Sequence, residues 1–204
     1  MTRGVKRSAR AVLDRRDAVA AVLQARGDAL VITGLGAPTW DAAAAGDHDG
    51  NFYLWGGMGG AAMIGLGLAV ARPDRRVLVI TGDGELLMGL GSLATIAAEA
   101  PRNIAILIVD NERYGETGMQ RTHTAAGVDL AAVAKACGFL TTKRVSARSQ
   151  LAALRTAIHR TPGPLFAQVK VVAEKIPLVL PPRDGGLLKS RFRKALLGEG
   201  ADLD

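Results

Sequence analysis

The hydrophobic positions of this chain follow two patterns, short continuous apolar runs and longer segments with apolar residues at helical spacing. The apolar runs are typical of buried strands and cover 29–33, 76–81, 103–109 and 165–172, and a further strand is expected at 141–145. The segments with helical spacing or helix-end signals cover 6–26, 56–71, 86–99, 130–137, 149–160 and 187–197. This alternation predicts an α/β fold, a doubly wound, mostly parallel sheet with helices on both faces.

Glycines and polar residues mark the boundaries of the expected elements. Gly27 ends the first helix, and a polar loop over 41–51 follows the first strand and its turn. The run at 103–109 (NIAILIV) has no polar face, as expected for a central parallel strand. We therefore expect one domain over 1–180, with an amphipathic helix at its N-terminus, and a basic C-terminal tail over 181–204.

Composition narrows the classes of function. Of the 204 residues, 49% are hydrophobic and 22% are charged, values that are ordinary for a globular domain. The net charge of +7 comes from basic residues at the two ends, so nucleic-acid binding is not expected of the domain. No apolar stretch approaches the ~20 residues of a membrane span, and the single cysteine favours a cytoplasmic protein.

The candidate chemistry lies in loops that follow the expected strands. In open α/β sheets, ligands bind at the carboxyl ends of the strands. The second strand is followed by Gly82-Asp83-Gly84, which predicts a sharp turn, an anion site and a carboxylate beside it. The next strand is followed by Asn111, a second oxygen ligand. Oxygen ligands beside an anion indicate a Mg²⁺ site.

These residues carry a resemblance to a known family. Gly82-Asp83-Gly84 followed by Asp110-Asn111 resembles the thiamine-diphosphate motif, with Asp in place of its first Asn. Three longer segments resemble the pyrophosphate domain of sulfopyruvate decarboxylase (its beta subunit) and phosphonopyruvate decarboxylase. They are NFYLWGGMGGAAMIGLGLA, GDGELLMGLGSLATIA and IVDNERYGETGMQ. The resemblance implies the thiamine-diphosphate-binding fold.

The resemblance also implies roles for individual residues. Mg²⁺ would be bound by the Asp83 and Asn111 side chains and the Arg113 carbonyl. Met58 would lie beneath the cofactor and bend it, while the Gly56 carbonyl would accept a hydrogen bond from the cofactor's 4′-amino group. The implied cofactor-binding residues are Gly34, Gly56, Gly57, Met58, Gly82, Asp83, Gly84, Glu85, Asn111, Tyr114 and Gly115.

Residues just after the motif leave the substrate open. His123 and Arg121 could meet an anionic substrate or transfer a proton, or could lie in a solvated loop. The suspected relatives tend toward a GGQPT-like run. In this chain the corresponding run is GMQRT (118–122), with Met119 in place of the second Gly and Arg121 in place of the Pro. We count His123 as a catalytic candidate and leave the 2-oxo acid unassigned.

The resemblance implies a thiamine-diphosphate- and Mg²⁺-binding subunit of a two-subunit 2-oxo acid decarboxylase. Such enzymes need a glutamate beside the pyrimidine ring, which belongs to a pyrimidine-binding domain. A chain filled by the pyrophosphate domain implies a separate pyrimidine-domain (alpha) subunit and a hetero-oligomer. The alternatives are a carboligase or oxidative acyl-transfer subunit, or a cofactor-binding regulatory protein without turnover.

Overall fold

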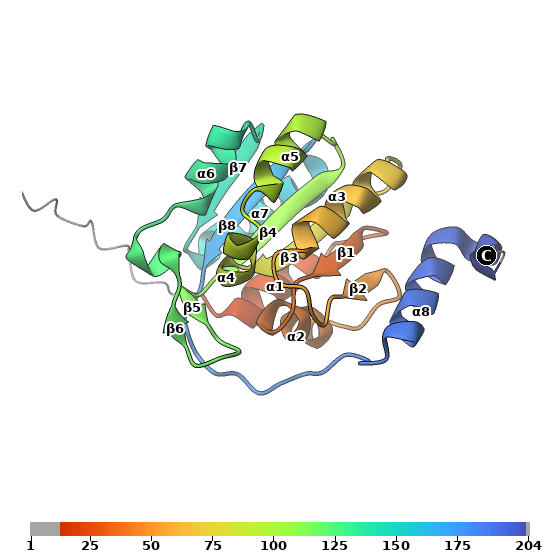
Figure 1. The fold of residues 1–204 in the computed structure, drawn as a ribbon, viewed down its shortest axis with the longest axis horizontal. Coiled ribbons are helices and arrows are strands. Elements are labelled where there is room, and N and C mark those ends of the chain that lie inside the picture. Colours follow the sequence, from red (N-terminus) through yellow and green to blue (C-terminus); the bar gives the residue numbers. More distant parts are fainter. Residues whose placement is uncertain (1–12, 203–204) are drawn as a thin grey trace, which may run out of the picture.

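The computed structural model describes residues 13–202, which form a six-stranded sheet with helices on both faces (Figure 1). All six strands are parallel, in the order β2-β1-β3-β4-β8-β7. The strands are β1 (Leu30–Thr33), β2 (Asn51–Tyr53), β3 (Val77–Gly82), β4 (Ile104–Asp110), β7 (Thr141–Val145) and β8 (Leu165–Lys170). The prediction of a doubly wound parallel sheet is confirmed.

Two layers of helices bury the two faces of the sheet. One layer contains α1 (Arg15–Leu23), α2 (Ala37–Ala44) and α7 (Leu151–Arg160), and the other contains α3 (Ala61–Ala71), α5 (Ser92–Glu99) and α6 (Leu130–Cys137). Successive strand residues point to opposite layers, so Leu78 packs with the first core and Val79 with the second. Every residue of β4 is buried, which explains why its sequence is apolar from Ile104 to Val109.

The order of the strands places a switch point between β1 and β3. From β1 the chain continues to β2 on one side, whereas β3 lies on the other side and leads toward β4. The loops after β1 and β3 therefore diverge at the carboxyl edge of the sheet, where ligands bind in such folds. The short helix α4 (Asp83–Met88) begins there, directly after β3.

Three expected boundaries were wrong. Part of the expected polar loop at 41–51 is helical, because Pro38 starts α2 and Asp41 turns inward to meet Arg15. The expected helix at 86–99 is two helices, α4 and α5, separated at 89–91. The first helix begins at Arg15 and ends at Leu23, before Gly27, and the first residues of the expected helix lie outside the described residues.

Two further elements complete the chain. A hairpin of β5 (Arg113–Tyr114) and β6 (Gln120–Arg121) stands beside α4, followed by the 3₁₀ helix η1 (His123–Ala126). Two more 3₁₀ helices are η2 (Arg148–Gln150) and η3 (Gly198–Asp202). No helix within 13–202 is long and apolar enough to cross a membrane.

The C-terminal segment is docked on the domain. The expected helix at 187–197 is α8 (Gly185–Leu197), and it packs beside β2 at the edge of the sheet (Figure 1). The rings of Phe52 and Phe192 meet edge to face, with centroids 5.6 Å apart, and Arg191 donates to Asp47 at 2.6 Å. Part of the expected basic tail therefore covers an edge strand.

Candidate functional site

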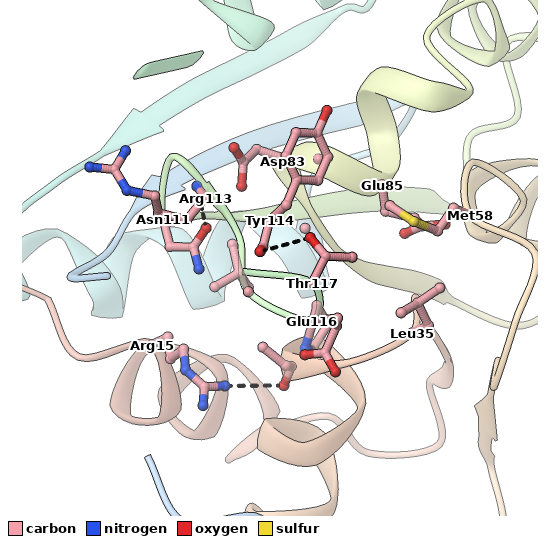
Figure 2. A pocket seen from close by; sticks show the side chains of 16 residues that line it. Arg15, Leu35, Met58, Asp83, Glu85, Asn111, Arg113, Tyr114, Glu116 and Thr117 are labelled. Carbon is pink, nitrogen blue, oxygen red and sulfur yellow. Dashed lines mark hydrogen bonds between the residues drawn. The ribbon is translucent and has the colours of Figure 1, made fainter. Parts of the chain in front are cut away.

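A cleft with an empty volume of about 620 Å³ opens at the carboxyl edge of β3 and β4 (Figure 2). It is lined by Arg15, Leu35, Ala37, Pro38, Met58, Gly82, Asp83, Gly84, Glu85, Val109, Asn111, Arg113, Tyr114, Gly115, Glu116 and Thr117. Loops that follow β1, β2, β3 and β4 all contribute, as expected at a switch point.

The cleft brings together most of the residues predicted from the sequence. Those in its wall are Met58, Gly82, Asp83, Gly84, Glu85, Asn111, Arg113, Tyr114 and Gly115. Those outside its wall are Gly34, Gly56, Gly57 and His123. His123 is exposed at the start of η1, between two buried threonines. The individual roles of all these residues stay predictions.

Asp83 is the first residue of α4, and its carboxylate is held by two hydroxyl groups. The side chain is only 1% exposed, and Oδ2 accepts from Thr122 Oγ1 at 2.5 Å. Thr124 Oγ1 lies 2.9 Å from the same oxygen. Burial, with the nearby Asp110 carboxylate as a second cause, raises the pKa of Asp83 to about 6. Asp83 was expected in a turn before the helix, but it is buried in the first turn of α4.

Asp110, the residue that replaces the first Asn of the motif, is fully buried in a network of donors. Lys170 Nζ on the adjacent strand β8 donates to its Oδ2 at 2.9 Å, and Gln168 Nε2 donates at 2.6 Å. Thr124 Oγ1 lies 2.8 Å from its Oδ1. Since one hydroxyl has one hydrogen, Thr124 can donate to Asp110 or Asp83 but not to both. Lys170 thus offsets the negative charge that the Asn-to-Asp exchange introduces.

The oxygen donors beside the cleft fit Mg²⁺. Asn111 Oδ1 accepts from the Arg113 N–H at 2.9 Å, and its second lone pair remains for a cation. A divalent cation at Asp83 would also relieve the repulsion between Asp83 and Asp110. The described residues contain no cluster of three His, Cys, Asp or Glu side chains suited to a metal. A cation here therefore needs further oxygens, which a diphosphate supplies.

Gly84 is required by a close approach. A Cβ at this position would lie 2.5 Å from the ring of Tyr114, so any side chain would displace the hairpin from α4. Neither Gly82 nor Gly84 has a left-handed backbone, and Gly82 is extended, with φ −87° and ψ 160°. The expectation that these glycines allow a sharp turn is therefore wrong. Gly84 is needed because it leaves space for the Tyr114 ring, and not because the backbone needs conformational freedom there.

Met58 projects from a glycine-rich turn between β2 and α3. Its side chain is 36% exposed and lines the cleft near Glu85 (Figure 2). An apolar side chain with this exposure, between glycines, is free of the hydrophobic core and available to a ligand. The position suits the predicted contact beneath a bent cofactor.

A second cavity, with an empty volume of about 830 Å³, adjoins the cleft. The two share Arg15, Ala37, Asn111, Gly115 and Glu116, and the second is also lined by Trp40, Met119 and 174–178. Arg15 between them is buried and paired with Asp41, with 2.5 Å from Nη1 to Oδ2. Met119, where the sequence departs from the suspected relatives, therefore lies in this second cavity.

Comparison with known proteins identifies the family. Residues 41–169 match the C-terminal TPP binding domain of thiamine pyrophosphate enzymes. The chain belongs to this family. The matched range contains Met58, Asp83 and Asn111, so the predicted thiamine-diphosphate-binding domain is confirmed.

Several curated relatives of this family member are named decarboxylases. Sulfopyruvate decarboxylase subunit beta of Methanothermobacter thermautotrophicus is 37% identical over 94% of this chain and 100% of its own length. The subunit of the same name from Methanocaldococcus jannaschii is 45% identical over 53% of this chain and 57% of its own length. Phosphonopyruvate decarboxylase of Streptomyces hygroscopicus is 48% identical over 61% of this chain but 31% of its own length. These matches confirm the resemblance stated from the motifs.

Solved structures agree on the fold of this family member. Benzoylformate decarboxylase from Polynucleobacter necessarius matches with a TM-score of 0.70 at 17% identity. The match covers 87% of this chain and 36% of the other, so this chain corresponds to about one third of that protein.

The sequence missed the residues that hold the motif in place. Thr122, Thr124, Gln168 and Lys170 contact Asp83 or Asp110 but carry no motif of their own. One signal was available. An Asp in place of the motif's Asn, at the end of a buried strand, favours a cation nearby, and Lys170 ends the last buried strand.

Proposed function

We propose that this chain is the thiamine-diphosphate- and Mg²⁺-binding subunit of a two-subunit decarboxylase of a small 2-oxo acid. The substrate class that we propose is sulfopyruvate or phosphonopyruvate, after the names of the relatives. The observation that carries the proposal is the cleft in which Asp83, Asn111 and Met58 meet, within the matched family domain.

In this proposal the chain holds the diphosphate end of the cofactor. Asp83, Asn111 and the Arg113 carbonyl bind Mg²⁺, and the backbone of Gly84 and Glu85 faces the diphosphate. When bound, thiamine diphosphate supplies a thiazolium ring that accepts the electron pair left when CO₂ departs. Thr122 and Thr124 keep the Asp83 carboxylate in place, and Met58 and the Gly56 carbonyl orient the ring system.

A separate pyrimidine-domain (alpha) subunit would supply the activating glutamate. The relative that aligns over 100% of its own length is itself named as a beta subunit, which supports a two-subunit enzyme. Two glutamates near the cleft already have partners within this chain. Glu85 accepts a hydrogen bond from the Ala61 backbone N–H, and Glu112 forms an ion pair with Lys170 at 2.5 Å. The exposed side of Met58 leaves the cleft open for a partner chain to cover.

The test is reconstitution with product analysis. The chain is co-expressed with a pyrimidine-domain chain, and sulfopyruvate and phosphonopyruvate are offered with thiamine diphosphate and Mg²⁺. We expect CO₂ and free aldehyde in equal amounts from the complex and neither from this chain alone. A ligated product in place of the aldehyde would indicate a carboligase. Turnover by this chain alone, free of any co-purifying subunit, would overturn the two-subunit proposal.

A further inference from the structure

Glu85 is buried where α4 meets the glycine-rich turn over residues 56–60. The residue is 5% exposed, and its Oε1 accepts from the Ala61 backbone N–H at 3.2 Å. Burial raises the pKa of Glu85, and hydrogen bonds from the backbone of Ala61 and Gly59 counter part of this effect. The side chain therefore bonds to the turn that carries Met58, which is not a contact implied by the family resemblance.

Helix α3 has a specific need for this carboxyl group. Its N-cap is Gly60, which has no side chain to accept from the first backbone N–H groups, and its first turn contains no acidic residue. A carboxylate at a helix N-terminus accepts a free N–H and interacts favourably with the helix dipole. Glu85, from a different helix, supplies that group.

The other end of α4 contacts the same turn. A Cβ on Gly89 would lie 2.3 Å from the Gly59 carbonyl oxygen, so the two backbones touch. Gly59 has φ +89°, a conformation that side chains other than glycine rarely adopt. Glu85 by a hydrogen bond and Gly89 by backbone contact thus hold the turn from both ends of α4.

The second carboxyl oxygen reaches a third loop of the cleft. Glu85 Oε2 and Thr81 Oγ1 are buried without a hydrogen-bond partner among the described residues. A Cβ added to Gly34 would lie 2.1 Å from Glu85 Oε2 and 2.3 Å from Thr81 Oγ1. Both oxygens therefore pack against Gly34. The side chain therefore touches the loop after β1 as well as the start of α3 beside the turn.

We propose that Glu85 is a positioning residue that fixes the Met58 turn relative to the diphosphate end of α4. Asp83 and Glu85 lie on one short helix, so a single rigid element would set both the metal ligand and the residue beneath the cofactor. In Figure 2 the Glu85 side chain lies beside Met58, with Asp83 nearby on the same helix. The effect on the cofactor rests on the proposed function, but the effect on the turn does not.

The test begins with amide hydrogen exchange in the full chain without cofactor. Glu85→Ala removes the acceptor, and we expect amides over 57–62 to exchange about tenfold faster or more, with β3 and β4 unchanged. Glu85→Gln keeps an acceptor for the Ala61 N–H and should preserve slow exchange. Glu99→Ala, an exposed glutamate on α5, is the matched control and should change nothing. Unchanged exchange over 57–62 in Glu85→Ala would overturn the proposal.

A second pair of variants covers the case in which Glu85→Ala does not fold. Glu85→Leu fills a similar volume without an acceptor, so it should exchange faster over 57–62 than Glu85→Gln. Equal exchange in these two variants would contradict the proposal. In the reconstituted complex, Glu85→Leu should lower kcat more than it changes KM, and the loss of kcat should be larger in Glu85→Leu than in Glu85→Gln. A reconstituted wild-type complex that binds no thiamine diphosphate would refute the proposed function while leaving the exchange result interpretable.

Discussion

Asp83 depends on two threonine hydroxyls that lie 39 and 41 residues further along the chain. The motif predicted Asp83 as a candidate ligand because a glycine–aspartate–glycine run needs only local sequence. Thr122 and Thr124 follow an exposed hairpin without a hydrophobic period, so nothing in the sequence connects them to the carboxylate. A ligand was predictable here, whereas its supporting contacts required the fold.

Asp83→Asn should weaken Mg²⁺-dependent binding of thiamine diphosphate by at least about tenfold, since even outer-sphere partners of a metal contribute 10–100-fold. The amide keeps the size of the side chain but removes the negative charge that a cation needs. Isothermal titration with and without Mg²⁺ measures the effect. Asp28→Asn, an exposed carboxylate remote from the cleft, is the control. Equal affinity in Asp83→Asn and the wild type would remove Asp83 from the metal site.

Met58→Ala should lower turnover of the reconstituted complex more than it lowers cofactor affinity. The diphosphate contacts remain, but the side chain that shapes the bound cofactor is lost. Displacements of about 1 Å cost on the order of a hundredfold in rate. Because Met58 is 36% exposed, thermal unfolding should change little. Steady-state kcat and titrated affinity separate the two effects, and full activity would refute the position assigned to Met58.

Helices and strands were predicted where their pattern is long, and missed where it is short. Continuous apolar runs identified β3, β4 and β8, because burial on both faces demands such sequences. Helix α2 was missed because Asp41, a polar residue, is buried in an ion pair with Arg15. The pattern of polar and apolar residues cannot show that a charged side chain is buried in this way. The hairpin β5–β6 has two residues in each strand, too few for any period.

Lys170 joins β8 to β4 through Asp110, and its loss should destabilise the sheet. Lys170→Met keeps the length of the side chain but leaves the fully buried Asp110 carboxylate without its cation. Breaking a buried ion pair costs about 3–5 kcal/mol. Urea unfolding measures the change. Adding Asp110→Asn, which restores the Asn of the motif, should recover most of the stability, and two purely additive losses would show that the pair is not coupled.

At the scale of the whole molecule, the sheet predicts where ligands bind but not what completes the site. The alternation of strands and helices predicts that the sheet has a switch point at which ligands bind. Its exact position required the observed order of the six strands. The cleft remains open beside Met58, and the described part of the chain places no glutamate of its own beyond Glu85 and Glu116 in its wall. In the proposed function this chain binds the diphosphate end of the cofactor, and a partner chain covers the ring end.

This division predicts different affinities for two ligands. Inorganic diphosphate with Mg²⁺ should bind equally to the isolated chain and to the reconstituted complex, because this chain supplies its contacts. Thiamine diphosphate should bind at least about tenfold more tightly to the complex, since covering about 60 Å² of ring surface contributes about 1.5 kcal/mol. Titration of both ligands into both samples measures the difference. Equal affinity of the isolated chain and the complex for thiamine diphosphate would show that this chain binds the whole cofactor, and the partner would then be required only for the chemical step.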